Sequence, residues 1–219
     1  KVVSSNLYQG EDNRYHIDFQ DFEKKIVEEN VKLFFLCNPH NPVGRVWSAE
    51  ELGKLGDICV KNGVTVVSDE IHQDFVFKGK HQVFAGLKKE FQDISITCTS
   101  PSKTFNLASM MISNIFIPNP ELRRKFRKQL DAAGISQLNV LGLVACEAAY
   151  AHGEEWYEAM HSYVADNIAF TKEYVETQLP GVSMVDHEGT YLVWLDFRET
   201  GLSVDELEDL IVHLSLIHI

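Results

Sequence analysis

The sequence predicts an α/β protein with a mainly parallel central sheet, followed by the start of a smaller α/β domain. Two observations support this fold class. Between residues 31 and 119, apolar runs typical of buried strands alternate with helical segments. Beyond residue 119 the pattern changes to helices, and strand-like runs return after Pro180. Repeated strand–helix–strand order favours parallel pairing with right-handed crossovers.

Four runs supply the predicted strands of the central sheet: residues 31–39, 64–70, 94–100 and 113–119. The first, VKLFFLCNP, is continuously apolar, and we therefore expect a strand that is buried on both faces. The second and third, VTVVSDE and ISITCTS, are rich in β-branched residues, and each ends in a polar cluster. Two further strand-like runs, VSMVDHEG and TYLVWLDF, belong to the smaller domain.

Capping signals mark the predicted helices. Ser48 and Glu51 form a capping box and Gly63 supplies a stop, which together predict a helix over about 48–62. Of the remaining helices, one is expected to begin at Asn119–Pro120 and another at a second capping box formed by Ser203 and Glu206. Two more are expected over 137–151 and 154–178. The basic run RRKFRK within the first of these predicts a solvated helix face.

The same pattern predicts how the chain is divided. Residues 1–135 are expected to form part of a large domain, 136–178 connecting helices, and 179–212 the start of a small C-terminal domain. Residues 213–219 are expected to be a non-native tail, because HLSLIHI does not extend the apolar stripe of the helix before it. The chain starts without methionine and closes just as a helix begins, and we therefore expect a fragment of a longer protein.

Composition narrows the class of function. The formal charge of −12 and the pI of about 5.1 argue against binding to nucleic acid or to anionic membrane surfaces. No segment is long and apolar enough to be predicted as a membrane span. The four cysteines lie far apart without CxxC pairing, and we expect reduced, buried thiols in a cytoplasmic protein. Chemistry on a small molecule is the expected function.

Three polar clusters follow successive strands of the predicted sheet: NPHNPVG, SDEIH and TSPSK. Ligands of open parallel sheets bind at the carboxyl ends of the strands, so these clusters are expected to converge. They supply an amide, a carboxylate, an imidazole, a hydroxyl and an amine, on Asn41, Asp69, His72, Ser100 and Lys103. This set is suited to hold a phosphorylated heteroaromatic aldehyde.

Each of these groups has a chemical use in such a site. A lysine amine can bond an aldehyde covalently and then move the α-proton of a substrate. A carboxylate facing a pyridine nitrogen keeps that nitrogen protonated, since opposite charges in contact shift pKa values by about 1–3 units. An amide or imidazole can donate to a ring oxygen, and serines near a helix start can take a phosphate.

NPHNPVGRVW, VVSDEIHQDF and SPSKTFNLAS, in this order, resemble the fold-type I pyridoxal-phosphate enzymes of the class I/II aminotransferase superfamily. More narrowly, they resemble the MalY/PatB-type cystathionine β-lyases, because His72 stands where ordinary aminotransferases usually have tyrosine. The resemblance implies that Lys103 bonds pyridoxal phosphate, Asp69 faces its ring nitrogen, and Asn41 donates to its ring oxygen. It further implies that Ser100 contacts the phosphate and that His72 lies near the ring oxygen.

The resemblance implies a carbon–sulfur β-lyase that acts on cystathionine or related cysteine S-conjugates, and a homodimer when full length. An aminotransferase, or a regulatory or inactive chain that only binds cofactor, stays open as an alternative. One departure concerns the phosphate, because Met111 stands where many relatives carry a phosphate-binding arginine. The family's glycine-containing phosphate loop and its carboxylate-binding arginine are expected outside this chain.

Three other interpretations of the clusters are weaker. Lys103 alone could be a loop lysine paired with an acid, but Asn41 and Asp69 in register argue for the cofactor site. A metal site around His72 and His81 lacks the two-histidine helical spacing, and we predict no metal. SPSK also matches the S-x-x-K pattern of serine β-lactamases, whose companion motifs SDN and KTG do not occur in the sequence.

Overall fold

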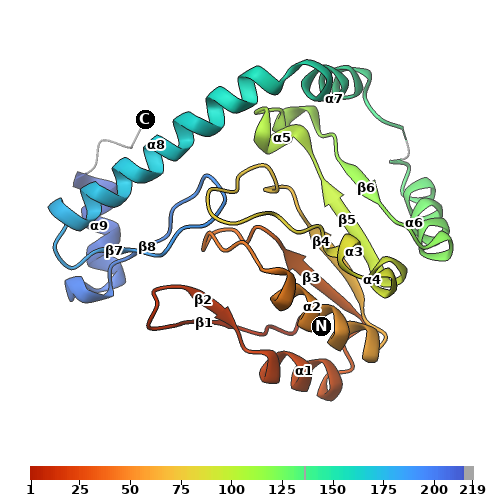
Figure 1. Cartoon of the computed structure of the whole chain (residues 1–219), viewed down its shortest axis with the longest axis horizontal. Helices are drawn as coiled ribbons and strands as arrows, with labels where there is room; N and C mark the ends of the chain where they lie inside the picture. The colour runs from red at the N-terminus through yellow and green to blue at the C-terminus, as the bar shows by residue number, and fades with distance from the viewer. Residues whose placement is uncertain (136, 215–219) are drawn as a thin grey trace.

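The computed structural model describes residues 1–135 and 137–214 (Figure 1). The elements follow in the order β1 (Leu7–Gln9), β2 (Tyr15–Ile17), α1 (Phe19–Glu28), β3 (Leu33–Cys37), α2 (Ala49–Lys61), β4 (Thr65–Asp69), α3 (Phe84–Leu87), α4 (Lys89–Ile94), β5 (Ser95–Thr99), α5 (Pro101–Thr104), the short 3₁₀ turn η1 (Ala108–Met110), β6 (Asn114–Phe116), α6 (Pro120–Ala132), α7 (Val140–His152), α8 (Glu154–Gln178), β7 (Ser183–Met184), β8 (Leu195–Asp196), the 3₁₀ turn η2 (Arg198–Thr200) and α9 (Val204–Leu214).

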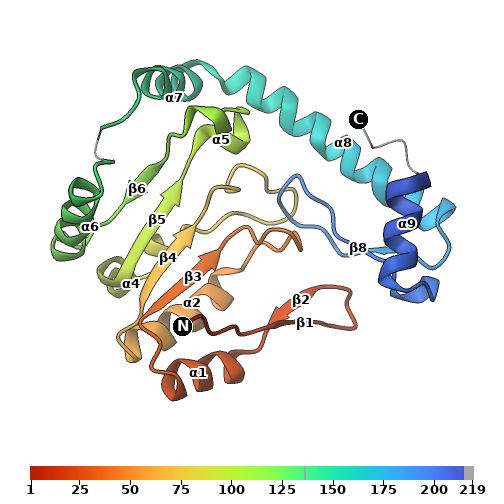
Figure 2. The ribbon, with the colours of Figure 1, turned by 180° about the vertical axis from the view of Figure 1, so that it is seen from behind.

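The central sheet has the strand order β3-β4-β5-β6. β3, β4 and β5 pair in parallel, and their arrows point the same way in Figure 2. β6 pairs antiparallel with β5 at the edge of the sheet. The helix between the first two strands, α2, supplies the crossover that a parallel pair requires. The predicted fold class, α/β with a mainly parallel sheet, is therefore confirmed.

The hydrophobic core lies between one face of this sheet and helices α1 to α4 (Figure 1). Leu36 and Val66 of the strands pack there against side chains of the helices and of the loop before α2. The buried partners from these segments are Phe22, Ile26, Trp47, Leu52, Leu55, Cys59, Phe84 and Phe91. The core positions the carboxyl ends of β3, β4 and β5 side by side at one edge of the sheet.

The opposite face of β3 is open in the described chain. Leu33 is 43% exposed and Phe35 is 72% exposed, whereas Leu36 points into the core. The expectation that this strand is buried on both faces is therefore wrong here, because no described element packs on the side of Phe35 closely enough to bury it. A continuous apolar run shows that both faces are apolar, but it does not show what covers them.

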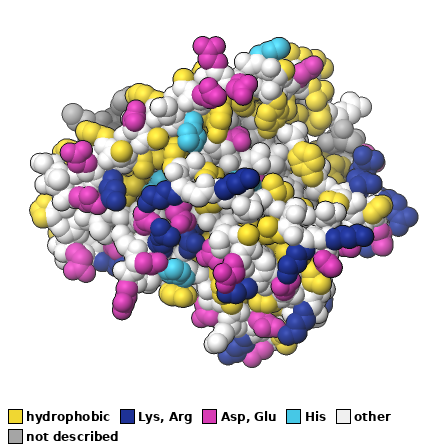
Figure 3. All heavy atoms as spheres, in the orientation of Figure 1, with side chains coloured by type: hydrophobic (Ala, Val, Ile, Leu, Met, Phe, Trp, Pro, Cys, Tyr) yellow, Lys and Arg dark blue, Asp and Glu magenta, His cyan; other side chains and the backbone are white. Residues whose placement is uncertain are grey.

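The predicted caps are present. Ser48 Oγ accepts from the Glu51 N–H at 3.2 Å while Glu51 accepts from the Ser48 N–H at 2.8 Å, and Gly63 follows the helix with a φ of 63°. Ser203 and Glu206 form the same reciprocal arrangement before α9. α6 buries none of its residues, and Figure 3 shows lysine and arginine side chains gathered over it at the right edge. The predicted solvated basic face is confirmed.

The strand-like runs after Pro180 form only the two-residue strands β7 and β8. The reason is that the backbone between them bonds to loops elsewhere in the chain. Glu188 and Gly189 donate their N–H groups to Gly44 O, and Thr190 donates to Phe75 O. This segment therefore packs beside the residues that follow β4, under the long helix α8 (Figures 1 and 2).

Other sequence expectations have mixed outcomes. All four cysteines are free, but only Cys59 is buried, so the expectation that all are buried is wrong. α9 continues through Leu214, which is two residues into the predicted non-native tail. Residues 215–219 of that tail lie outside the described residues. The same holds for residue 136, at the predicted start of the connecting helices. None of the helices in the described part of the chain combines the length and hydrophobicity of a membrane span.

Candidate functional site

Asp69 is the last residue of β4 and lies at the carboxyl edge of the sheet. In the strand register its neighbours are Cys37 of β3 and Cys98 of β5. The side chain is exposed, and its Oδ1 accepts from the N–H of Ile71 at 3.1 Å. Because the sheet places this carboxylate between two strand ends and leaves it accessible, Asp69 can face a ligand bound across the edge.

His72 lies in the turn that follows β4 and is 2% exposed. Its ring centroid is 5.4 Å from that of Tyr191 and 6.1 Å from that of Phe75. Burial lowers the pKa of His72; the positive charge of Lys103 lowers it further, and Asp69 opposes the shift. The imidazole is therefore neutral near pH 7, and both charged groups lie close enough to act on it.

Lys103 is carried by the four-residue helix α5, directly after β5. Ser100 caps this helix, since its Oγ accepts from the Ser102 N–H at 3.0 Å. The Ser100 hydroxyl also donates to Ile112 O at 2.7 Å, so its proton is already used within the protein. A short turn after a buried strand thus presents the lysine amine at the same sheet edge as Asp69.

Asn41 lies in the loop after β3 and is exposed. Its backbone N–H donates to Cys37 Sγ at 3.5 Å, and Cys37 is the register partner of Asp69. The loop is closed by a bridge between His40 and Arg45. Asn41 therefore stands at the strand end next to that of Asp69.

The structure thus places Asp69 and Lys103 close enough to His72 for their charges to affect its pKa. Asn41 lies at the adjoining strand end. Ser100 is one helical turn before Lys103, and its hydroxyl points to Ile112. Met111 ends the turn η1 in the left-handed region, with a φ of 50°, and is 85% exposed. It offers no charge for a phosphate.

Sequence reasoning missed Tyr191, which contacts His72 and also packs edge-on against Phe75 at 5.0 Å. It missed Glu70 as well, a fully buried carboxylate directly after Asp69. Glu70 accepts from Ser68 Oγ at 2.8 Å and from the Phe84 N–H at 3.1 Å, and it contacts His81 Nε2 at 2.8 Å. Neither role has a local signal, because the partners of Tyr191 are far away in sequence and SDE is an ordinary strand end.

Arg45 holds the loop after β3 in place. It is 5% exposed, and its Nε donates to Glu188 Oε2 at 2.7 Å while Nη2 donates to Glu51 Oε1 at 3.0 Å. Its guanidinium also lies over the Trp47 ring, 4.6 Å from the centroid. This buried cluster joins the Asn41 loop to the segment that carries Tyr191. Among the described residues, no cluster of His, Cys, Asp or Glu side chains is arranged to hold a metal ion.

The profile of the family "aminotransferase class I and II" matches residues 1–214, and the chain belongs to that family. It is 48% identical to cystathionine β-lyase PatB of Bacillus subtilis over 90% of this chain and 51% of that protein. It is 31% identical to protein MalY of Escherichia coli over 89% of this chain and 50% of that protein.

Solved structures show the same relationship. Cystalysin from Treponema denticola, which contains pyridoxal 5′-phosphate, matches with a TM-score of 0.93 and 38% identity, over 97% of this chain and 54% of that one. A PLP-bound C–S lyase from Staphylococcus hominis matches with a TM-score of 0.86 and 39% identity, over 95% and 53%. The resemblance to the PatB/MalY type is confirmed, and the chain spans about half the length of the curated relatives it matches.

Proposed function

We propose that the whole protein is a pyridoxal-phosphate-dependent carbon–sulfur β-lyase. It would convert a cysteine S-conjugate such as cystathionine, with one water, into a thiol, pyruvate and ammonia. The observation that carries the proposal is the position of Lys103 directly after β5, where its charge acts on His72 together with that of Asp69. Relatives named as cystathionine β-lyases and C–S lyases support the same reaction.

The donor set fits the aldehyde and ring ends of this cofactor. An amine, an exposed carboxylate and an amide lie at neighbouring strand ends, and His72 Nδ1 is a buried polar atom without a partner among the described residues. The fit is poorer at the phosphate end, because Met111 is uncharged and the Ser100 proton is bonded to Ile112. When bound, pyridoxal phosphate supplies an aldehyde carbon and a ring that accepts electrons from the substrate's Cα.

Each residue has a defined task in this proposal. Lys103 Nζ would hold the aldehyde carbon of the cofactor and would take the proton from the substrate's Cα. Asp69 would pair with the ring nitrogen and keep it protonated. Asn41 donates its amide N–H to the ring oxygen, with His72 nearby, and Ser100 is the proposed contact to phosphate. Loss of the Cα proton would let the Cβ–S bond break, and the thiolate would leave as the thiol after it takes the proton that Lys103 removed from Cα.

The proposal extends to the setting of the enzyme. We keep residues 1–135 as part of the cofactor domain, 136–178 as connecting helices and 179–212 as the start of the small domain. A homodimer is proposed for the whole protein. A cytoplasmic location is proposed as well, supported by the four free cysteines.

Pyruvate release from cystathionine tests the proposal. The whole protein, loaded with pyridoxal phosphate, is expected to release thiol and pyruvate in equal amounts, and Lys103→Ala is expected to abolish both. Lys172→Ala, a change on the exposed side of α8, serves as the control. Transfer of the amino group to a 2-oxo acid without free thiol would make the protein an aminotransferase, and cofactor binding without turnover would make it a binding protein.

A further inference from the structure

Asp74 joins three segments around the lysine turn. Thr104, the residue next to Lys103, is 2% exposed, and its Oγ1 donates to Asp74 Oδ2 at 2.6 Å. From α8, the Tyr157 hydroxyl donates to the backbone O of Asp74 at 2.8 Å. Asp74 itself belongs to the segment after β4 that contains His72. Hydrogen bonds to a carboxylate are stronger than those between neutral groups. The bond from Thr104 to Asp74 is therefore a strong connection between α5 and the segment after β4.

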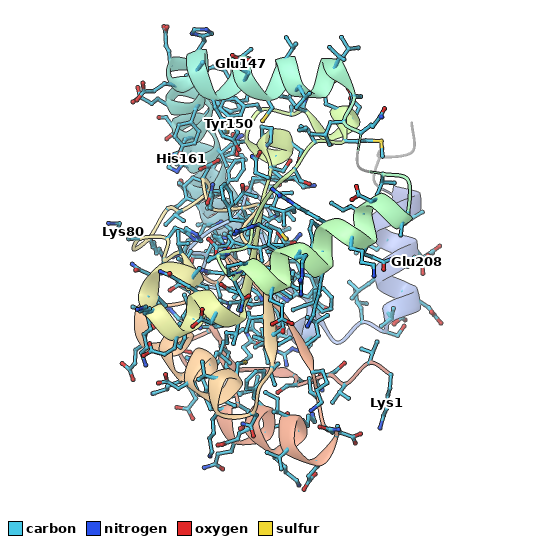
Figure 4. The ribbon with its side chains drawn as sticks, turned by 90° about the vertical axis from the view of Figure 1, so that its right-hand side faces the viewer. Lys1, Lys80, Glu147, Tyr150, His161 and Glu208 are labelled. Carbon is cyan, nitrogen blue, oxygen red and sulfur yellow. The ribbon has the colours of Figure 1, made fainter. Side chains whose placement is uncertain are left out.

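The lysine turn depends on such contacts because α5 has only four residues and cannot be held by its own hydrogen bonds. Its start is tied by Ser100 to Ile112. Its end is packed by Phe105, whose ring lies 5.7 Å from that of Trp156 and 6.0 Å from that of Tyr150. Tyr150 is labelled in Figure 4. These contacts bind α5 to α7 and α8, whereas the bond from Thr104 binds it to Asp74 in the segment after β4.

We propose that Asp74 is a positioning residue for Lys103. Through Thr104 it aligns the turn that carries the amine with the segment after β4, which contains His72 and follows directly on Asp69. The inference rests on the proposed function, in which the amine must reach the aldehyde carbon while the ring meets Asp69. A displacement of about 1 Å between reacting groups can cost about a hundredfold in rate, so a link between the two segments matters for catalysis.

The test removes the link from either side in the whole protein. Thr104→Val and Asp74→Ala each lose the bond, whereas Thr104→Ser and Asp74→Asn keep a donor and an acceptor. Thr177→Val is the matched control, because Thr177 Oγ1 bonds only within α8: it donates to Glu173 O at 2.7 Å and accepts from Gln178 Nε2 at 3.2 Å. For each variant we would measure how fast Lys103 captures pyridoxal phosphate, using borohydride reduction and peptide mass spectrometry.

Capture of pyridoxal phosphate is expected to slow about tenfold in Thr104→Val and Asp74→Ala, and by no more than this in the double variant. Thr104→Ser and Asp74→Asn should restore capture to within about twofold. With cystathionine, kcat should fall while KM changes little, because the link acts on the placement of the amine. If Thr104→Val acted through a general loss of structure, the hydroxyl present in Thr104→Ser would not by itself restore capture.

Reductive methylation of the cofactor-free protein with formaldehyde and cyanoborohydride separates this inference from the proposed function. In the two link-breaking variants Lys103 should be methylated faster, because its turn is released, while Lys172 on α8 keeps its rate. Unchanged capture and unchanged methylation in Thr104→Val would overturn the role of Asp74. Faster methylation of Lys103, in a protein that captures no pyridoxal phosphate even as wild type, would instead refute the proposed function.

Discussion

Asp69 illustrates how one side chain at a strand end can be tested without disturbing the fold. It is exposed, and its carboxylate accepts one backbone bond, from Ile71. In the proposed mechanism its charge holds a proton on the ring nitrogen of the cofactor. Loss of the Asp69 carboxylate should therefore reduce catalysis much more than it reduces the stability of the fold.

We predict that Asp69→Ala lowers kcat by at least about a hundredfold, because the ring loses the group that keeps it protonated. Lys103 should still capture pyridoxal phosphate, and the unfolding curve should stay close to that of the wild type. The matched control is Asp57→Ala, which removes an exposed carboxylate of α2 that is paired with Lys88. Near-normal turnover in Asp69→Ala would show that the assignment is wrong.

Glu70 should behave in the opposite way. Its carboxylate is fully buried and satisfies the Phe84 N–H, Ser68 Oγ and His81. We predict that Glu70→Ala lowers the free energy of unfolding by about 3 kcal/mol, since buried donors lose their acceptor and a cavity is left. Urea unfolding measures this, with the exposed Glu90→Ala of α4 as control. A loss of stability no larger than that of the control would contradict the observed network.

At the scale of elements, α2 contains two glycines in different surroundings. A Cβ at Gly53 would have no neighbour within 4 Å, whereas a Cβ at Gly56 would overlap the ring of Phe91. That ring is fully buried and stacks on Phe84 with centroids 4.9 Å apart, so it has little room to move. The close approach of α2 to α4 therefore depends on the missing side chain of Gly56.

We predict that Gly53→Ala stabilises the protein by about 0.5–1 kcal/mol, through the better helix propensity of alanine. Gly56→Ala should destabilise it by about 1–3 kcal/mol, because overpacking outweighs the same gain in propensity. The two variants control for each other, since substitution and helix are the same. Thermal unfolding measures both, and equal shifts of Tm would refute the packing described for α2.

At the scale of the whole molecule, three histidines couple stability to pH. Burial is the main cause that lowers the pKa values of His40, His72 and His187. An unfolded histidine titrates near about pH 6.5, so below that pH the unfolded chain takes up protons that the folded chain does not. Their contribution to stability is therefore complete above about pH 6.5 and is lost as the pH falls.

We predict that the free energy of unfolding decreases between about pH 7.5 and about pH 5.5, and that His187→Gln makes this decrease smaller. Glutamine can still donate to Thr190 O, the partner of His187 Nε2 at 2.9 Å, so the hydrogen bond is kept. His152→Gln, a change of an exposed side chain, is the control. If the free energy of unfolding depended on pH identically in the wild type, His187→Gln and His152→Gln, then His187 would not contribute to the pH dependence of stability.

Much of the fold could be predicted because its signals are local. The capping boxes at Ser48 and Ser203 involve residues three positions apart, and β3, β4 and β5 each lie within a predicted apolar run. The positions of Asn41, Asp69 and Lys103 could be predicted in the same way, because each lies at the end of a strand or within a few residues after it. Their roles stay proposals until the variants are measured.

Other features could not be predicted because they depend on partners distant in sequence. The antiparallel pairing of β6 and the exposure of Phe35 follow from which elements lie beside the sheet. The loss of strand structure around Glu188 follows from hydrogen bonds to Gly44 and Phe75. No residue pattern within the segment 182–197 predicts such contacts.

The sequence by itself determined the α/β order, the capped starts of α2, α6 and α9 and the residue types at the three strand ends, because hydrogen bonds and side-chain periodicity within each segment are decided locally. Only the tertiary structure decided that His72 packs on Tyr191, that Glu70 is buried beside an exposed Asp69, and that Asp74 joins Thr104. Those contacts join segments far apart in the chain, and burial and charge become defined only once the segments pack together.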